Sequence, residues 1–349
     1  MARVARGFVV VAALAALAAL ALAPTGAGAS APRLASAQAT VPSALSNRLP
    51  LERLVFSHPV AATALPPLVL SPALPTTWRQ VAPNAVQAVA TEVLAPGVTY
   101  RIPAPTGISC TARCVFTGVR DTSVAVATDV VWEDQLLAQL GYLPVTFTPA
   151  APQATPSAAV GGVFTWAYPS LPTVLRAQWG VGSDNVVLQG ALMAFQLQSG
   201  LATTGQADPT TWADLVQAAN AGTTDPHPYD FVHVSMALPE TLTLYVAGRA
   251  VFHTPVNTGI PASPTAPGTY PVYLRYLSQT MSGTNPNGTH YSDPGIPDVS
   301  YFHGGDALHG FIRASYGFPQ SLGCVEMPFS AAKTVFPHTP IGTLVTVTP

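Results

Sequence analysis

The sequence predicts a multidomain fold in which a small bundle of three helices precedes a β-rich C-terminal domain. The chain has 349 residues, and at roughly 100–200 residues per domain it is long enough for two or three domains. Apolar residues recur with helical spacing between 129 and 222, and with the alternating period of a β-strand after 229. Residues 223–229 contain two prolines and are predicted to form a stiff linker between these patterns.

Charge is sparse and nearly balanced along the chain. There are 14 Lys and Arg against 16 Asp and Glu, and the charged fraction is 9%, whereas typical soluble domains have about 25%. The basic residues are scattered and form no basic patch of the kind that binds nucleic acid. Lys333 is the single lysine, which offers little for binding anionic membranes.

The N-terminus has the organisation of a secretory signal peptide over 1–31. Arg3 and Arg6 form a basic start, residues 8–23 are an unbroken apolar run, and Pro24 and a small-x-small cleavage site follow. An uncleaved membrane anchor is the alternative, although the run is shorter than the ~20 residues that a bilayer span prefers. No other stretch is apolar enough to span a membrane, so we expect an exported, soluble protein.

The three cysteines divide into a close pair and a single residue. In an oxidising compartment, Cys110 and Cys114 are predicted to form a disulfide that closes a small loop, with two unpaired surface thiols as the alternative. No second Cys or His cluster accompanies them, which argues against a zinc pair. Cys324 is then a buried bystander, an intermolecular linker or a reactive thiol.

Two segments precede the helical region. Residues 32–50, rich in Ala, Ser, Pro and Gln, are predicted to be a flexible spacer. Residues 51–128 mix short Val- and Thr-rich runs with Pro-Gly breaks. This pattern indicates a small β-rich or irregular module of unknown role.

Residues 129–222 carry the signals of three short helices. Each predicted helix has one apolar stripe, so the helices must pack on one another. In the last helix Asp208 is a natural N-cap and Pro209 occupies the first turn, where its missing N–H costs nothing. The middle helix is predicted to begin after a cap at Ser183 or Asp184. The stripes and their closing glycines are Leu136, Leu137, Leu140 and Gly141; Val187, Leu188, Leu192, Phe195 and Gly200; and Trp212, Leu215, Val216, Ala219 and Gly222.

Four phrases in this region, Leu140–Pro144, Met193–Gln196, Gly200–Leu201 and Asp208–Trp212, together resemble the peptidoglycan-binding domain, a small three-helix bundle. The resemblance implies a module that holds the protein on peptidoglycan. A Pro-rich insert interrupts it and carries three aromatic residues that are either core residues or part of a groove that stacks on glycan. They are Trp166, Tyr168 and Trp179.

Alternation with period two dominates the chain after residue 229 and predicts a strand-rich domain. The turn signals Pro267-Gly268 and Asn287-Gly288 interrupt it. The predicted strands are Val232–Met236, Leu242–Val246, Phe252–Val256, Tyr270–Leu274 and Leu344–Val347.

The densest polar segments, 301–310 and 321–327, contain His309 and Cys324. A thiol must lose its proton to be a nucleophile, because its free pKa is ~8.5. A neighbouring imidazole takes that proton and later returns it to a leaving amine. Gly323 leaves the sulfur open and lets backbone N–H groups face a developing oxyanion.

His309-Gly310, followed after a loop by Ser321-Leu322-Gly323-Cys324, resembles the catalytic signature of the YkuD-type L,D-transpeptidases. The resemblance implies a β-rich, mixed catalytic domain with Cys324 as the acylated nucleophile and His309 as its base. Ser321 and Gly323 would shape the nucleophile turn, and the backbone N–H of Cys324 would donate to the oxyanion. Further matching phrases extend the resemblance over 229–349: Val256–Gly259, Pro264–Tyr270 and Pro340–Thr343.

Two positions depart from the commoner pattern of that family. Leu322 stands where many members have histidine, so the base must act without that help. Glu326 stands where many members have arginine or asparagine, and its carboxylate would repel the carboxylate of a stem peptide. Arg313 either compensates by binding the substrate or is an ordinary surface arginine. Tyr291 and His303 are further candidates for substrate contact, with core and cleft-wall roles as their alternatives.

The resemblance implies a cell-wall cross-linking enzyme that needs no metal or organic cofactor. It would attack the third residue of a donor stem tetrapeptide, release D-alanine and pass the acyl group to a neighbouring amine. Peptidoglycan would be its partner, and we expect an exported monomer that is wall-associated or secreted.

Three alternatives stay open at this point. The same acyl-enzyme resolved by water would make an L,D-carboxypeptidase, and a degenerate domain would leave a non-catalytic peptidoglycan-binding protein. A zinc peptidase is the third, with His303, Asp306 and His309 as ligands and His290 as a fourth.

Overall fold

The structure, a computed structural model, describes residues 38–41, 50–57, 59–91, 94, 96–103, 116–117, 122–126, 129–152 and 158–349. Contacts divide the chain into Met1–Ala35 and Ser36–Pro349, and every described residue belongs to the second unit. The predicted signal peptide and the Cys110–Cys114 pair lie outside the described residues. Within the described ranges, no helix combines the length and apolar character needed to cross a bilayer.

Two small sheets lie in the part of the chain before residue 129. One has the strand order β3-β4-β2-β6 and the other the order β1-β7-β5. A short 3₁₀ helix, η2 (Ala62–Ala64), follows β2. The strands are β1 (Gln38–Val41), β2 (Pro50–Phe56), β3 (Thr76–Ala82), β4 (Ala85–Ala90), β5 (Thr99–Ile102), β6 (Phe116–Thr117) and β7 (Thr122–Val126).

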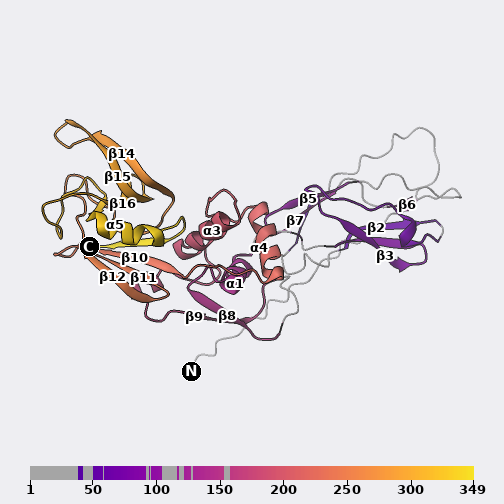
Figure 1. The fold of residues 1–349 in the computed structure, drawn as a ribbon. Coiled ribbons are helices and arrows are strands. Elements are labelled where there is room, and N and C mark those ends of the chain that lie inside the picture. The colour runs from indigo at the N-terminus through magenta and orange to yellow at the C-terminus, as the bar shows by residue number, and fades with distance from the viewer. Residues whose placement is uncertain are drawn as a thin grey trace, which may run out of the picture. The chain divides into compact units, whose positions relative to one another are not determined.

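The predicted bundle of three helices is not what the structure shows for 129–222: four helices and a two-stranded sheet lie among its described residues (Figure 1). All four helices contribute to one hydrophobic core, which includes the ring pair of Trp132 and Trp212, whose centroids are 5.3 Å apart. Gly141 and Gly222 end their helices in the left-handed conformation, as the sequence predicts. The elements are α1 (Val130–Leu140), β8 (Val145–Pro149), β9 (Gly162–Trp166), α2 (Thr173–Arg176), α3 (Val186–Gln198) and α4 (Pro209–Ala221).

The predicted N-cap of the middle helix is wrong by one or two residues. Asn185, rather than Ser183 or Asp184, caps α3, and its Oδ1 accepts the N–H groups of Val187 and Leu188. Ser183 instead closes a local turn by donating its hydroxyl to Gly180 O at 2.7 Å. An amide side chain satisfies the first N–H groups of a helix as well as a hydroxyl does, so sequence alone does not separate these neighbours.

The aromatic residues of the Pro-rich insert pack against the helical core. Trp166, Tyr168 and Trp179 are all partly buried there. Trp179 lies edge-on to Phe164, with ring centroids 6.0 Å apart, and Tyr168 stacks on Tyr229 at 6.4 Å. These contacts account for the three rings as packing residues, and the relation of this region to peptidoglycan stays a prediction.

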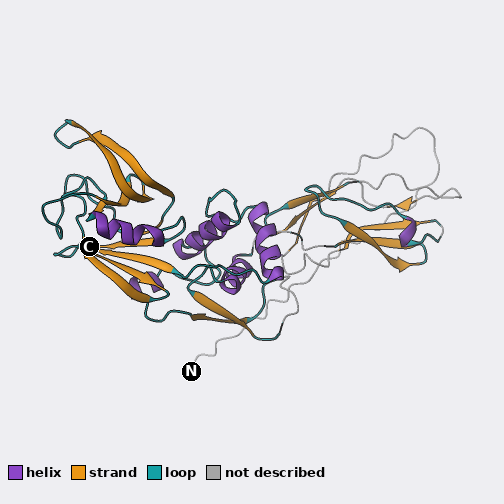
Figure 2. Ribbon diagram, viewed as in Figure 1, coloured by secondary structure: helices purple, strands orange, loops and turns teal. Residues whose placement is uncertain are grey.

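The C-terminal part contains two sheets and a helix around a second core (Figure 2). The first sheet has the order β12-β11-β10-β18-β13, in which the last strand of the chain pairs parallel with β10. The second has the order β14-β15-β16-β17. The elements are β10 (Asp230–Ser235), β11 (Thr241–Val246), β12 (Arg249–Pro255), β13 (Gly268–Pro271), β14 (Leu274–Thr284), β15 (His290–His303), β16 (Asp306–Gly310), β17 (Val325–Met327), α5 (Phe329–Val335), η3 (Phe336–His338) and β18 (Leu344–Thr348).

One predicted strand, Tyr270–Leu274, is divided between the two sheets. β13 ends at Pro271, which has no N–H for a further ladder bond. Val272 then turns inward and donates to Thr343 O, and Leu274 opens β14 in the other sheet. An alternating apolar pattern does not show where a chain changes sheets.

Strands β10 and β18 of the first sheet have buried side chains on both faces. Val232 and Val345 lie in the second core, together with Val335 of α5. Their sequence neighbours Phe231 and Leu344 point the other way, into the core of the helices. The same two strands therefore complete two hydrophobic cores.

Candidate active site

Cys324 stands at the end of a tight turn directly before β17. Ser321, itself buried, donates its hydroxyl to Cys324 O at 2.5 Å and accepts the N–H of Gly323 at 3.2 Å. Gly323 has φ +117°, and a Cβ there would lie 2.5 Å from Asp306 Oδ1. The turn thus requires glycine at 323 for both its conformation and the close approach of Asp306.

Two further hydroxyl side chains, those of Thr265 and Ser263, hold this turn by hydrogen bonds to its backbone. The buried hydroxyl of Thr265 donates to Gly323 O at 2.7 Å and accepts the N–H of Gly259 at 2.8 Å. Ser263 donates its hydroxyl to Leu322 O at 3.0 Å. Gly259 and Thr265 belong to the segments Val256–Gly259 and Pro264–Tyr270 noted in the sequence, and Ser263 lies directly before the second of them.

His309 lies on β16, the strand that pairs parallel with β17 and sets His309 opposite Glu326. Its side chain is buried, and Nδ1 lies 3.0 Å from Gly310 O. Because a carbonyl only accepts, Nδ1 carries the proton and Nε2 is left with its lone pair. Burial lowers the pKa of His309, since the charged imidazolium is poorly solvated there. The neutral form is the one that can take a proton.

The Cys324 thiol is protonated in this environment. Burial raises its pKa to about 12, the carboxylates of Asp306 and Glu326 raise it as well, and a backbone hydrogen bond from Ala307 lowers it. The Sγ atom lies 3.6 Å from Gly305 O, which accepts the thiol proton. The shifts of the two pKa values therefore favour a neutral thiol at Cys324 and a neutral imidazole at His309.

Glu326 is not an exposed charge. Its carboxylate is buried and receives two bonds from Arg313, from Nε at 2.7 Å and from a terminal nitrogen at 2.8 Å. The guanidinium also lies over the ring of Phe311, 4.6 Å from its centroid. The predicted repulsion by Glu326 is therefore balanced inside the protein by the same arginine that the sequence pointed to.

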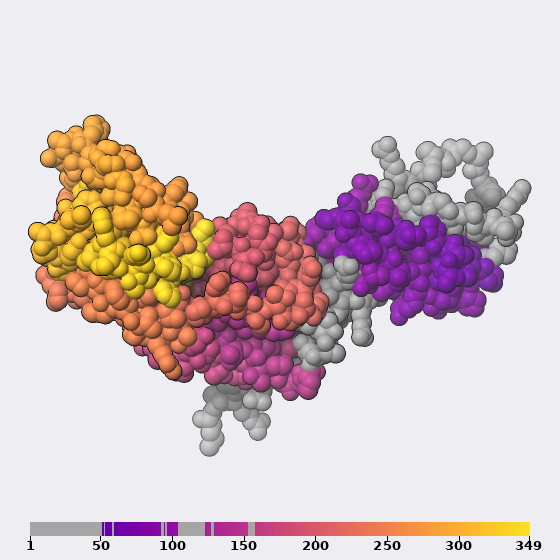
Figure 3. All heavy atoms as spheres, in the orientation of Figure 1, coloured from indigo at the N-terminus to yellow at the C-terminus, as the bar shows by residue number. Residues whose placement is uncertain are grey.

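A cleft of about 1140 Å³ opens in front of Cys324 and His309. One wall is the long β14–β15 hairpin, which Figure 3 shows in orange standing out from the neighbouring strands. Tyr291 and Arg313 both line the cleft, and their contact with substrate stays a prediction. Burial raises the pKa of the Tyr291 phenol, and the proximity of Cys324 adds to the shift.

His303, the other predicted candidate for substrate contact, packs on Tyr270 and Asp306 outside the cleft lining. Its ring lies on Tyr270, with centroids 4.4 Å apart, and its Nδ1 is 3.5 Å from Asp306 Oδ2. It is not among the residues that line the cleft. Its direct contact is with Asp306, which also accepts the N–H of Ala266 at 3.1 Å.

The residues proposed for a zinc site do not come together as a ligand set. Among the described parts of the chain, no three His, Cys, Asp or Glu side chains are grouped so that they could hold a metal ion. His290 lies in the β14–β15 hairpin, where its Nδ1 is 3.1 Å from the hydroxyl of Thr284.

Sequence reasoning missed two contributions to the site. Asp306, considered there only as a metal ligand, packs against the nucleophile turn and raises the pKa of Cys324. Sequence reasoning also missed the β14 wall of the cleft, including Gln279 and Met281, because the polar second half of this strand lacks the apolar alternation of a half-buried strand. The Asn287-Gly288 turn was the available signal for this hairpin.

Residues 230–347 match the YkuD family, described as the L,D-transpeptidase catalytic domain. Among solved structures, the chain is similar to the catalytic domain of the E. faecium L,D-transpeptidase, with 25% identity, a TM-score of 0.31, and coverage of 36% of this chain and 100% of that one. It is also similar to an L,D-transpeptidase from Mycobacterium smegmatis, with 12% identity, a TM-score of 0.32, and coverage of 90% and 95%.

L,D-transpeptidase 3 from Mycobacterium tuberculosis, in complex with a faropenem-derived adduct, is similar at 13% identity and a TM-score of 0.32, with coverage of 91% and 97%. A search of curated proteins found no match.

Proposed function

Residues 230–347 form a YkuD-type L,D-transpeptidase catalytic domain, and on that premise we propose that the protein is an exported cysteine acyltransferase that cross-links peptidoglycan stem peptides. The observation that carries the proposal is the placement of its two reacting groups. His309 lies on β16, Cys324 directly precedes the parallel neighbour β17, and both face one cleft.

In the first half-reaction, Sγ of Cys324 attacks the carbonyl of the diamino-acid residue at the third position of a donor tetrapeptide. Nε2 of His309 takes the thiol proton and delivers it to the departing amine of D-alanine. A thioester forms as the peptide bond breaks, so atoms and charge balance without a cofactor. The backbone N–H of Cys324 faces the developing oxyanion, and donors of this kind contribute about 10²–10³ each to the rate.

In the second half-reaction, a side-chain amine of a neighbouring stem attacks the thioester. His309 takes a proton from that amine and returns one to the leaving thiolate, which restores the neutral thiol and imidazole. Water in place of the amine gives the carboxypeptidase outcome.

The Arg313–Glu326 ion pair favours a catalytic domain over a degenerate one. A lone buried carboxylate in the cleft would repel the carboxylate of a stem peptide, but here the guanidinium neutralises it through two bonds. The helical region, if it binds the wall polymer as its resemblance suggests, would raise the local concentration of substrate at the cleft.

The test is the intact mass of the protein after exposure to a carbapenem, together with the turnover of a stem tetrapeptide by a separate sample that has not met the carbapenem. We expect a covalent adduct that is absent in Cys324→Ser, and an adduct that forms about 10²–10⁴-fold more slowly in His309→Gln. With tetrapeptide alone, a dimeric product supports cross-linking and a tripeptide supports hydrolysis.

Two results would overturn the proposal. An adduct that persists in Cys324→Ser would remove that residue as the nucleophile. No adduct and no turnover, with retained binding to isolated wall, would favour the non-catalytic binding protein.

A further inference from the structure

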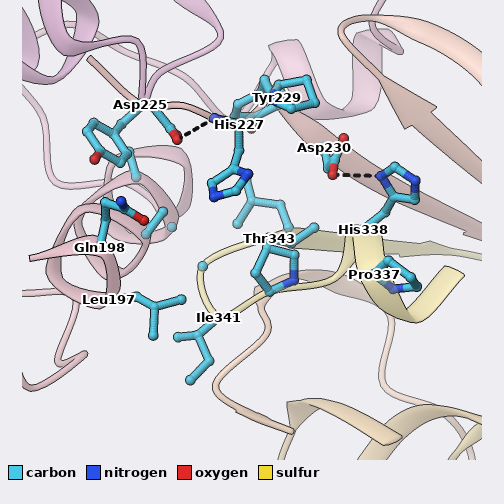
Figure 4. Close-up of a pocket in the computed structure, with 18 residues that line it drawn as sticks. Leu197, Gln198, Asp225, His227, Tyr229, Asp230, Pro337, His338, Ile341 and Thr343 are labelled. Atoms are coloured by element: carbon cyan, nitrogen blue, oxygen red, sulfur yellow. Dashed lines mark hydrogen bonds and ion pairs between the residues drawn. The ribbon is translucent and has the colours of Figure 1, made fainter. Parts of the chain in front are cut away.

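Glu240 is a buried carboxylate, 1% exposed, that takes part in none of the ion pairs of the described residues. Two other carboxylates of the catalytic part have a nitrogen partner. Glu326 accepts two bonds from Arg313. Asp230 and His338 line a second cavity, of about 290 Å³, where Oδ2 of Asp230 lies 2.9 Å from Nδ1 of His338 (Figure 4). Burying a carboxylate is costly unless hydrogen bonds compensate, so the bonds of Glu240 indicate what it does.

Both oxygens of Glu240 bind one residue, Thr258. Oε2 accepts the backbone N–H of Thr258 at 2.7 Å, and Oε1 accepts its hydroxyl at 2.6 Å. Thr258 is itself 1% exposed. Because one carboxylate binds both the backbone and the side chain of Thr258, it restrains the peptide plane and the side-chain rotamer of that residue together.

Thr258 in turn holds the start of the nucleophile turn. Its carbonyl oxygen accepts the N–H of Gln320 at 2.9 Å and that of Ser321 at 3.0 Å. The hydroxyl of Ser321 then donates to Cys324 O at 2.5 Å. A continuous series of hydrogen bonds therefore leads from Glu240 to the backbone of the residue that carries the thiol.

Glu240 reaches the site only through other residues. Neither it nor Thr258 lines the catalytic cleft, whereas Gln320 and Cys324 both do. A displacement of a reacting atom by about 1 Å can lower a reaction rate about 100-fold. Residues that fix the backbone behind the thiol can therefore affect the rate without contacting the substrate.

We propose that Glu240 is a positioning residue for Cys324: its carboxylate fixes Thr258, and Thr258 fixes the segment 320–321 from which the nucleophile turn begins. This inference rests on the proposed function, in which Cys324 is the nucleophile, and extends it to a residue outside the cleft. A residue that served only for packing would not need its two oxygen acceptors.

The experiment compares Glu240→Gln with Glu240→Met. Glutamine keeps an acceptor for the Thr258 N–H and can donate its amide to the Thr258 hydroxyl, whereas methionine has a similar length and no oxygen acceptor. The rate of acylation at saturating carbapenem is followed by intact mass. We expect it to stay within about threefold in Glu240→Gln and to fall by about 10–100-fold in Glu240→Met.

A second readout does not depend on the proposed reaction. It is the rate of iodoacetamide labelling, followed on the peptide that contains Cys324. We expect this rate to rise several-fold at about pH 7.5 in Glu240→Met, because a displaced thiol enters water and approaches its free pKa of ~8.5. Glu240→Gln should label at the wild-type rate.

Gln135→Met is the matched control. Gln135 lies on α1, is 5% exposed, and also spends both polar atoms of its side chain on one residue, Val160. Its Nε2 donates to Val160 O at 2.8 Å, and its Oε1 accepts the Val160 N–H at 3.0 Å. This variant should lower the melting temperature and leave both rates at Cys324 unchanged.

A second pair of variants decides the question should Glu240→Met fail to fold. Thr258→Val loses the hydroxyl that binds Oε1 of Glu240, and Thr258→Ser keeps it. We expect acylation to slow by about tenfold in Thr258→Val and to stay close to the wild-type rate in Thr258→Ser.

The positioning role is wrong if Glu240→Met acylates and labels at the wild-type rates, if Gln135→Met changes both rates to the same extent, or if Thr258→Ser loses as much as Thr258→Val. Equal loss in Glu240→Gln would also contradict it, because the hydrogen bonds are kept there. A wild-type protein that forms no adduct would contradict the proposed function instead. The labelling rates would then still decide whether Glu240 positions Cys324.

Discussion

Arg313 donates two hydrogen bonds to Glu326, with Nε 2.7 Å from one carboxylate oxygen and a terminal nitrogen 2.8 Å from the other. Glu326 is buried on β17 opposite His309, whereas the Arg313 side chain is 30% exposed. The two charges neutralise each other in the wall of the cleft, next to His309. Because Arg313 neutralises it, Glu326 does not present an uncompensated negative charge to an anionic substrate.

Arg313→Ala should be destabilising because it leaves a buried carboxylate without its partner. We expect a loss of about 1–3 kcal/mol in the free energy of unfolding, measured by chemical denaturation. The double variant Arg313→Ala/Glu326→Gln should recover most of that loss, since the remaining group is neutral. Equal stability of the single and double variants would show that the pair contributes nothing beyond packing.

The raised pKa of Cys324 predicts slow alkylation near neutral pH. The thiolate is the reactive form, so the rate of iodoacetamide labelling should rise with pH across the range up to about 9 without a plateau. Asp306→Asn removes a negative charge that raises this pKa, so labelling should become several-fold faster at the same pH. A labelling rate that levels off below about pH 8 would contradict the buried, protonated thiol.

Gly323→Ala should disrupt the nucleophile turn without affecting the rest of the sheet. The new Cβ would meet Asp306 in a backbone conformation with φ +117°, at a cost of about 1–3 kcal/mol. A displaced sulfur should reduce carbapenem acylation by about 100-fold, followed by intact mass against time. Gly161→Ala is the control outside the cleft, because its Cβ would meet no atom within 4 Å; comparable loss in both variants would argue against the steric cause.

Two buried carboxyls on α1 predict that stability falls as pH rises. Burial raises the pKa of Glu133 from 4.5 to about 8 and that of Asp134 from 3.8 to about 7. A carboxyl whose pKa is higher in the folded state contributes its full stabilisation to the free energy of unfolding when the pH is below the pKa in the unfolded state. This stabilisation is lost as the pH rises through the pKa in the folded state. The melting temperature should therefore drop by roughly 5–10 °C between about pH 5 and about pH 9.

Glu133→Gln should flatten this pH dependence, whereas Asp214→Asn, on the partly exposed side of α4, should not. Differential scanning fluorimetry across the pH range measures both. A wild-type curve that is flat above about pH 5 would contradict the burial of an uncharged carboxyl.

Local signals in the sequence predicted much of what the structure contains. The N-cap residues and closing glycines of α1 and α4 bond to backbone atoms within a few residues of them. They can therefore be recognised without tertiary context. The same holds for the turn before Cys324, in which the hydroxyl of Ser321 accepts the N–H of Gly323 and donates to Cys324 O, two and three residues away. The assignment of catalytic roles to Cys324 and His309 stays a prediction that their shared cleft supports.

Long-range relationships were the part that the sequence did not reveal. Arg313 was suspected of balancing Glu326 through the substrate, but the direct ion pair depends on how the loop after β16 folds back. Asp306 and Gly323 are brought together only by the pairing of β16 with β17. The β14–β15 wall was missed because polar, glycine-containing strands carry little periodic signal.

The opposite orientations of Phe231 and Val232 on β10 have a consequence for how the protein melts. One side chain belongs to the core of the helices and the next to the core of the catalytic strands, and Leu344 and Val345 repeat the arrangement on β18. A fragment that begins at the linker would present one side of its own sheet to water. The helices and the catalytic strands are therefore expected to unfold in a single cooperative transition, and the catalytic part to lose solubility when it is expressed without them.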